Sequence, residues 1–443
     1  MVVLDYDKAL QNDENFQSML ASTVQYSGHL RNVIESGVYI AAESSIVLPT
    51  DEALLEKVQA LAEHYKSPAL RYHVVIGIGG SNLGTKAIYD ALYGYADVLE
   101  SARMPKILFA ETTSPDWLQM FGRLAQTLES PEQIIVSVIS KSGGTSETLA
   151  NFEIIVQTLA AHFGETAAIL PRVVAITDED SALWEQAGAL GLQRLPLQLP
   201  VGGRYSVLSA VGLFPLATIG CDIVALRRGA AEMRTLCVSD DTSENLAAQS
   251  ATVLAHYHSK AAVINDNFFF NPQLESLGKW YRQLMGESVG KQDSLSGETV
   301  HAGITPTVSL GSTDLHSVGQ LYLGGPKDKI TTFVYTQKHG DVAVPAASDR
   351  VLPELVPIIS GKKASDIMQA IFDGTRLAYA NAALPSMTVM LDTIDEYNLG
   401  AYLQFKMNEM MYLGQLMNVN SFDQPNVELY KIETKRILTG TNS

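Results

Sequence analysis

The sequence has few cysteines, no basic tract and no signal peptide. Two cysteines, Cys221 and Cys237, occur among 443 residues, which is too few for a disulfide framework and lacks metal-ligand spacing. A reducing compartment is the simplest setting for such a chain. The first residues, MVVLDYDKALQND, carry acidic side chains where a secretory signal needs a basic segment and an apolar core. A cytoplasmic protein is therefore expected.

Charge and hydropathy argue against two further classes of partner. The formal net charge of −17 at pH 7 makes nucleic acid and anionic membrane surfaces poor partners. The most apolar long stretch, residues 205–221, contains Ser, Gly, Pro and Thr and is too short to span a bilayer, so it predicts a buried helix. An anionic substrate would have to be held by a few local cations against an unfavourable overall field.

The length of the chain and its alternation of strand-like and helical patterns predict two α/β domains. A chain of 443 residues exceeds the usual size of a single core. Residues 1–65 are polar with apolar residues at helical spacing, which predicts an exposed helical arm. After the arm, apolar β-branched segments alternate with helical patterns, which is typical of doubly wound parallel sheets. We therefore predict one such domain over residues 66–225 and a second, with C-terminal helices, over residues 226–443.

The expected elements of the two domains differ in clarity. In the first domain strands are expected at 73–78, 106–110, 134–139, 172–176 and 193–197. In the second domain the less clear strands are expected at 261–265, 304–309, 330–336 and 387–391. Helices are expected there at 275–285, 315–323, 365–383 and 396–417.

The segment IIVSVISKSGGTSET, residues 134–148, is the strongest indication of a ligand site. A β-branched apolar run ends in hydroxyls, glycines and one lysine, and a helical pattern follows. This predicts a buried strand, a tight loop and a helix start at the carboxyl edge of a sheet. The hydroxyls of Ser140, Ser142 and Thr145, the Lys141 ammonium and the helix N–H groups suit a phosphate. The alternative is a plain turn with a hydroxyl that caps the helix, and the motif alone leaves both open.

A second glycine-rich turn, in HVVIGIGGSNLGTKAIYDAL, matches no nucleotide motif. Asn82 stands where a dinucleotide fingerprint that starts at Gly77 requires glycine, and no Gly-Lys-Ser/Thr sequence follows. The remaining interpretation is a turn that brings Gly80 and Ser81 to a helix start, where they suit an anion or sugar hydroxyls. No nucleotide, redox or metal cofactor is expected.

Two segments offer a cation and a base. GGRYS places Arg204 after two glycines, which suits stabilisation of an oxyanion, although arginines there often form surface ion pairs. QLMGESVGKQ holds Glu287 in an E-S-x-G-K sequence. A near-copy of that sequence carries Glu275 one helix earlier, and either glutamate could be an exposed helix residue.

Two more segments hold single candidates. His316, in STDLHSVGQ, could exchange protons near neutral pH, although a lone histidine is more often structural. Lys431 ends NSFDQPNVELYK and, taken alone, is a solvated lysine. No His, Cys and Asp cluster has metal-ligand spacing.

Taken in this order, the five segments resemble the glucose-6-phosphate isomerase family, specifically its shorter bacterial form. The resemblance covers residues 70–435. SKSGGTSET is similar to the SKSGTTTET-like phosphate loop of that family, GGRYS matches directly, and NSFDQPNVELYK is close to its C-terminal signature. Two positions depart from the pattern, since Gly144 stands where threonine is usual and Asn426 where glycine is usual.

The resemblance implies two sugar-isomerase-type domains, a homodimer and the interconversion of D-glucose 6-phosphate and D-fructose 6-phosphate through an enediolate. It implies Glu287 as the base, Arg204 as the group that stabilises the intermediate, and His316 and Lys431 in ring opening. It also implies that the histidine enters from the neighbouring subunit. Implied substrate contacts are Gly80, Ser81, Ser140, Lys141, Ser142, Thr145 and Gln424. Neither a metal nor a cofactor is implied, and the reaction belongs to glycolysis and gluconeogenesis.

Residues before each E-S-x-G-K copy separate the two glutamates. Trp280, Tyr281 and Gln283 precede Glu287 as in the family pattern, so Glu275 is the decoy. Two alternatives remain: a non-catalytic phosphosugar-binding regulator of the same fold, or an isomerase of another phosphosugar, such as mannose 6-phosphate or an amino sugar.

Overall fold

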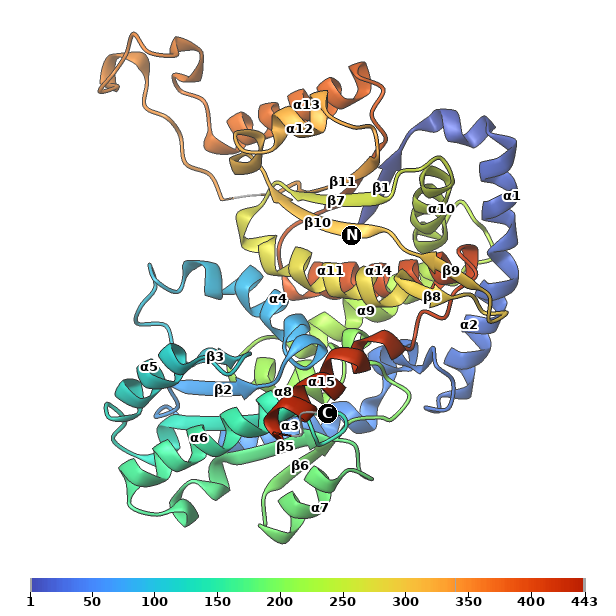
Figure 1. Ribbon diagram of the computed structural model, residues 1–443. Coiled ribbons are helices and arrows are strands. Elements are labelled where there is room, and N and C mark those ends of the chain that lie inside the picture. The colour runs from blue at the N-terminus through green and yellow to red at the C-terminus, as the bar shows by residue number, and fades with distance from the viewer. Residues whose placement is uncertain (1, 339, 441–443) are drawn as a thin grey trace.

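Two five-stranded sheets, separated by a layer of helices, form the body of the molecule (Figure 1). The computed structural model describes residues 2–338 and 340–440. Within these residues no single helix is long and apolar enough to cross a membrane, although one bent pair, Ser146–Phe163 with Thr166–Arg172, has the necessary length and composition. The expected α/β architecture with two parallel sheets and helical extensions is confirmed.

The first sheet is parallel throughout, with the strand order β3-β2-β4-β5-β6. Its strands are β2 (Tyr72–Ile76), β3 (Lys106–Ala110), β4 (Ile134–Ile139), β5 (Val173–Thr177) and β6 (Gln193–Pro196). Every residue of β4 is buried, because helices cover both faces of the sheet. Val74 and Val136 pack into the outer core, whereas Val75 and Ile135 pack into the central one. The strands predicted from β-branched runs lie within two residues of these bounds.

Helices on the two faces of the first sheet come from different parts of the chain. The outer helices are α5 (Pro115–Ala125), α6 (Ser146–Phe163) and α7 (Ala182–Ala189). The inner helices are α3 (Glu52–Tyr65), α4 (Leu83–Leu92) and α8 (Ala210–Thr218). Helix α8 is the buried helix expected within residues 205–221, since all of its residues except Ala217 are buried.

The second sheet has the order β1-β12-β11-β7-β10, and only β1 is antiparallel to its neighbour. The strands are β1 (Val3–Tyr6), β7 (Ile264–Phe269), β10 (Thr305–Leu310), β11 (Lys329–Thr336) and β12 (Ser386–Leu391). Outer helices α12 (Gly319–Gly324) and α13 (Ala364–Asn381) lie above it in Figure 1. Three inner helices lie between the sheets: α9 (Ile223–Cys237), α11 (Glu275–Val289) and α14 (Glu396–Leu416). Helix α10 (Leu246–Ser259) packs against α14 and lies beside β1.

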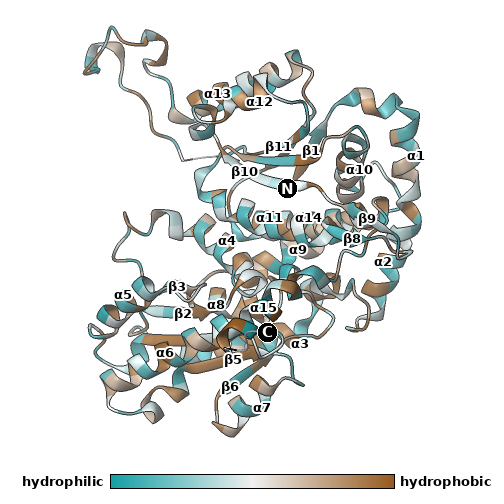
Figure 2. Cartoon of the chain, in the orientation of Figure 1, coloured by the Kyte–Doolittle hydropathy of each residue, from teal (hydrophilic) through white to brown (hydrophobic). Residues whose placement is uncertain are grey.

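The expected start of β7 is wrong by several residues. It was placed at 261–265, whereas β7 spans Ile264–Phe269. The reason is that Asn265, Asp266 and Asn267 are buried in this strand and interrupt the apolar pattern. Figure 2 shows that the first sheet, below, is coloured more apolar than the second sheet, above. The helix expected at 315–323 is also shorter, since α12 begins at Gly319.

The first 65 residues are not simply an exposed helical arm. Val3–Tyr6 forms an edge strand of the second sheet, and helices α1 (Glu14–Ser22) and α2 (Val24–Ser36) follow. Phe16, Leu30 and Val58 are fully buried in the central core. The apolar residues at helical spacing therefore pack against the body of the protein. The domain boundaries at 65 and 225 stay predictions.

Two further elements were not expected from sequence, the strands β8 (Lys291–Asp293) and β9 (Thr299–Ala302), which form a small hairpin after α11. Helix α15 (Glu428–Leu438), in contrast, is one of the expected C-terminal helices. Between β11 and α13, residues 340–363 extend away from the body, in orange in Figure 1. This excursion leaves several large apolar side chains exposed, namely Val342, Val351, Leu352, Leu355, Val356 and Ile358.

Candidate active site

Two glycine turns meet the C-terminal half of α11 at one edge of the first sheet. One is the single helical turn Gly79–Ser81 that follows β2, and the other is the turn Gly203–Tyr205. A Cβ on Gly80 would lie 2.1 Å from the carbonyl carbon of Gly203. This backbone contact therefore requires glycine at position 80. It brings Arg204 close to the residues that follow β2.

Arg204 is buried and fully engaged in hydrogen bonds. The surface ion pair considered from sequence is therefore excluded, because this residue is only 1% exposed. A guanidinium presents its donors in a rigid fork, so several fixed acceptors define its orientation. Those acceptors are Ser288 Oγ at 2.9 Å, Gln424 Oε1 at 2.6 Å, Glu287 Oε2 at 3.3 Å, and the carbonyl oxygens of Ser421 at 2.5 Å and Asp423 at 3.1 Å.

Glu287 and its decoy lie on the same helix but in different surroundings. Glu287 Oε1 accepts a hydrogen bond from Gln283 Nε2 at 3.0 Å, and its side chain is 27% exposed. Glu275, in the first turn of α11, pairs with Lys279 at 2.7 Å on the surface. The expectation that the copies lie on separate helices is wrong, since α11 spans both. Only Glu287 faces the cation Arg204.

The loop between β4 and α6 is open at the helix start. Thr145 is the N-terminal capping residue of α6, but its side chain makes no capping hydrogen bond. Its Oγ1 lies 3.0 Å from Ser140 Oγ, while Ser142 Oγ accepts from the Gly144 N–H at 3.4 Å. The first N–H groups of α6 are therefore not covered by a hydroxyl cap, as an anion site requires. A side chain at Gly144 would meet open space.

Lys141 links the loop to the Arg204 turn. Its Nζ donates to the Val201 carbonyl oxygen at 3.1 Å. Burial lowers the pKa of the Lys141 ammonium from its ordinary value, Asp178 opposes that effect, and the nearby Arg204 charge adds to it. A dianionic phosphate at this loop would favour the charged form of Lys141.

His316 and Lys431 lie outside this network. His316 directly follows the turn Thr313–Leu315 beyond β10; it is exposed, and its ring makes no hydrogen bond or ion pair with any described residue. Lys431, on α15, is exposed and pairs with Glu428 at 2.6 Å. Ser81 is half-buried beside Asn82, whose buried amide atoms have no partner among the described residues.

Sequence reasoning missed residues that orient the site. Ser288 accepts from Arg204 and also lies 2.9 Å from the Tyr205 hydroxyl. Gln283, one turn before Glu287, donates to one oxygen of the carboxylate while Arg204 donates to the other. The spacing of four residues between Gln283 and Glu287 was the available signal.

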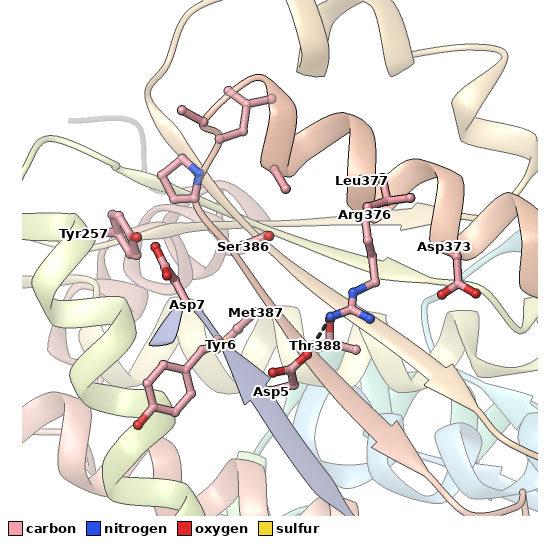
Figure 3. Close-up of a pocket in the computed structure, with 14 residues that line it drawn as sticks. Asp5, Tyr6, Asp7, Tyr257, Asp373, Arg376, Leu377, Ser386, Met387 and Thr388 are labelled. Carbon is pink, nitrogen blue, oxygen red and sulfur yellow. Dashed lines mark hydrogen bonds and ion pairs between the residues drawn. The ribbon is translucent and has the colours of Figure 1, made fainter. Parts of the chain in front are cut away.

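A separate cavity of about 720 Å³ lies at the edge of the second sheet (Figure 3). Asp5 on β1 pairs with Arg376 on α13 at 2.5 Å, and Asp7, Asp373 and Tyr257 also line the cavity. Its carboxylates outnumber its one cationic side chain, so it does not suit a phosphosugar. In the part of the chain that the structure describes, no group of three His, Cys, Asp or Glu side chains could hold a metal ion.

Residues 23–443 match the family described as phosphoglucose isomerase. A glucose-6-phosphate isomerase from Streptococcus agalactiae is 36% identical over 387 residues, which are 86% of this chain and 83% of that protein. One from Rubrobacter xylanophilus is 35% identical over 391 residues, or 87% and 86% of the two chains.

Two crystal structures show similar folds. A hypothetical protein from Thermus thermophilus superimposes with a TM-score of 0.84 at 30% identity, over 99% of this chain and 100% of that one. A glucose-6-phosphate isomerase from Chlamydia trachomatis has a TM-score of 0.75 at 23% identity, over 90% and 75% of the two chains. With this match across nearly its whole length, the chain belongs to the phosphoglucose isomerase family of enzymes.

Proposed function

We propose that this enzyme interconverts D-glucose 6-phosphate and D-fructose 6-phosphate through an enediolate, a step of glycolysis and gluconeogenesis. The observation that carries the proposal is the Glu287 carboxylate, which lies 3.3 Å from the buried guanidinium of Arg204. Isomerisation moves a proton between C1 and C2, which one carboxylate can do for both carbons. A positioned base of this kind contributes about 10²–10⁴-fold to the rate.

Arg204 supplies the fixed positive charge that the enediolate needs. Its hydrogen bonds to Ser288, Ser421 and Gln424 hold the guanidinium in place before the substrate arrives. No reorientation is then required when negative charge develops on the oxygens at C1 and C2. In this proposal Gln424 also lines the substrate site.

The phosphate of the substrate binds where α6 begins. Ser140, Lys141, Ser142 and Thr145 lie around the open helix start and are the proposed contacts, together with Gly80 and Ser81 in the turn that follows β2. The phosphate is remote from C1 and C2, so its binding energy orients the sugar without taking part in the chemistry.

Ring opening is assigned to His316 and Lys431, with the histidine supplied by a second copy of the chain. His316 is exposed beyond the end of β10, and its ring has no partner among the described residues. The apolar excursion at 340–363 supports a homodimer, because exposed apolar segments of this size often mark protein contacts. A two-fold interface would give two equivalent sites, each built from both chains. The two buried free cysteines fit a cytoplasmic enzyme.

A coupled assay with EDTA present tests the proposal. Fructose 6-phosphate is expected to give glucose 6-phosphate at a rate that the chelator does not change. Mannose 6-phosphate and glucosamine 6-phosphate, tested in parallel, should react far more slowly. Binding of fructose 6-phosphate without turnover would support a regulator instead, and faster turnover of another phosphosugar would assign a different isomerase.

Removing the Thr145 hydroxyl should weaken substrate binding more than catalysis. The Thr145→Val change keeps the shape of the side chain but removes a proposed phosphate contact. That contact is made equally in the ground state and in the transition state, so KM is expected to rise and kcat to change little. Steady-state kinetics with fructose 6-phosphate measure both. A fall in kcat at unchanged KM would contradict a phosphate-binding role.

Mixed dimers test whether His316 acts in the partner's site. His316→Ala and Glu287→Gln each inactivate every site of their own homodimer. After dissociation and random reassociation half of the dimers are mixed, and each has one intact site if the histidine acts across the interface. About a quarter of all sites should then be active. If tagged subunits exchange but activity stays absent, His316 acts within its own chain.

A further inference from the structure

Lys291 is a buried cation just beyond α11, the helix that carries Glu287. It follows the end of α11 by two residues, opens β8, and its side chain is 5% exposed. Its Nζ donates to the backbone carbonyl oxygen of Asp423 and lies 2.9 Å from the carboxylate Oδ1 of the same residue. A lysine is rarely so well buried unless it is paired. The Asp423 segment is therefore its specific partner.

A comparison of the two E-S-x-G-K copies shows why Lys291 can bind the Asp423 segment instead of the glutamate of its own copy. In the first copy Glu275 and Lys279 both lie within α11, four residues apart, and pair across one turn at 2.7 Å. In the second copy the helix ends at Val289, and Gly290 has the non-helical backbone angles φ −76° and ψ 93°. Lys291 therefore leaves the helix and does not pair with Glu287. The same sequence gives an ion pair within the copy in one place, and in the other a glutamate that pairs with Arg204 instead of with the lysine of its own copy.

Lys291 and Arg204 share one acceptor. The Asp423 carbonyl oxygen accepts from Lys291 Nζ and also from Arg204 Nη2 at 3.1 Å. The next residue, Gln424, directs its Oε1 to Arg204 Nη1 at 2.6 Å. Together with the Ser421 carbonyl oxygen, the turn 421–424 thus supplies three of the acceptors that orient the guanidinium, and Lys291 also binds this turn.

The turn also anchors the last helix. Helix α15 begins at Glu428 and none of its residues is buried, so packing does not fix its position. The segment before it is tied down at Asp423 by Lys291, and at Asn426 by Gln292, whose Oε1 accepts from Asn426 Nδ2 at 3.1 Å. Residues 291 and 292 of the hairpin therefore locate the helix that carries Lys431.

Electrostatics support the pairing. Burial lowers the pKa of Lys291 from its ordinary value, and Asp423 opposes that change through a hydrogen bond and its charge. The carboxylate thus helps to keep the buried lysine protonated, as the contact requires.

We propose that Lys291 is a positioning residue of this isomerase: it holds the turn 421–424 beneath Arg204, and so keeps Gln424 and α15 in place relative to Glu287. Lys291 itself does not touch the reacting carbons. The expected effect on kcat rests on the function proposed above. The contact between Lys291 and the turn at Asp423 does not depend on that function.

The test compares Lys291→Met with Lys279→Met, the matched lysine of the first copy. Lys291→Met removes a charged hydrogen bond from a buried site. This loss is expected to reduce kcat by about 10- to 100-fold. KM should change less than kcat, because the phosphate loop is untouched although Gln424 is displaced. Hydrogen exchange in the substrate-free protein should accelerate over residues 421–440 and stay unchanged in α6. Lys279→Met should match the wild type in all three measurements.

A second variant covers the case in which Lys291→Met loosens the whole protein. Asp423→Asn changes a half-exposed partner and keeps the backbone carbonyl, so it should lower kcat by about two- to fivefold and accelerate exchange in the same residues. Wild-type exchange over 421–440 in either variant, or unchanged kcat in a folded Lys291→Met, overturns the proposal. Exchange that accelerates in a protein without isomerase activity would leave the contact standing and refute the proposed function alone.

Discussion

Glu287→Gln is expected to lower kcat by about 10²–10⁴-fold while phosphosugar binding persists. The amide has nearly the shape of the carboxylate, but it cannot take a proton from carbon. The Lys141 loop and the start of α6 are unchanged, so the affinity for fructose 6-phosphate should stay close to that of the wild type. Steady-state kinetics and calorimetric titration measure the two effects separately.

Glu275→Gln is the matched control on the same helix. Glu275 pairs with Lys279 on the surface, and such pairs contribute about 0–1 kcal/mol to stability. Its kcat and KM should therefore equal those of the wild type. An inactive Glu275→Gln with an active Glu287→Gln would show that the base had been assigned to the wrong copy.

Arg204→Lys is expected to lower kcat by about 10²–10³-fold. Lysine keeps the charge but cannot reach Ser288, Gln424 and the two carbonyl groups at once, because its ammonium lacks the planar fork. The charge would no longer be fixed where the enediolate forms. KM should change less than kcat, because the phosphate contacts are retained.

Arg227→Lys provides a control for the loss of a buried arginine. Arg227 is 3% exposed and pairs with Glu52 at 3.3 Å, on the α3 and α9 side of the core. Both variants should lose some thermal stability, but only Arg204→Lys should lose activity. Equal activity in the two variants would contradict the proposed role of Arg204.

The sequence-based predictions were accurate where an element has a continuous apolar pattern and inaccurate where polar residues interrupt it or where only distant pairing defines it. Strand β4 was located to the residue, since an unbroken run of β-branched and small residues is buried on both faces. Strand β7 was misplaced because buried Asn265 and Asp266 hide its apolar pattern. Strand β1 was missed because its four residues pair with β12, at the far end of the chain, and nothing local specifies that pairing.

Within the site, motifs identified chemistry but not geometry. Arg204 and Glu287 were chosen from short sequences, and the structure places them in contact. Lys291 was overlooked, since its role depends on where α11 ends and on a turn that lies far away in sequence. His316 and Lys431 form no hydrogen bond or ion pair with that pair of residues within the described chain, so the proposed ring-opening role of His316 requires a partner subunit and that of Lys431 requires a particular placement of α15.

Isomerisation in D₂O tests proton transfer by Glu287 most directly. The wild type, incubated with fructose 6-phosphate until equilibrium is reached, should place deuterium at C1 of fructose 6-phosphate and at C2 of glucose 6-phosphate. Repeated turnovers exchange the proton held by the base with solvent, even if each single transfer is partly shielded. Over the same time Glu287→Gln should form product and incorporate label about 10²–10⁴-fold more slowly. Full conversion by the wild type without deuterium at either carbon would indicate hydride transfer and contradict an enediolate mechanism with Glu287 as the base.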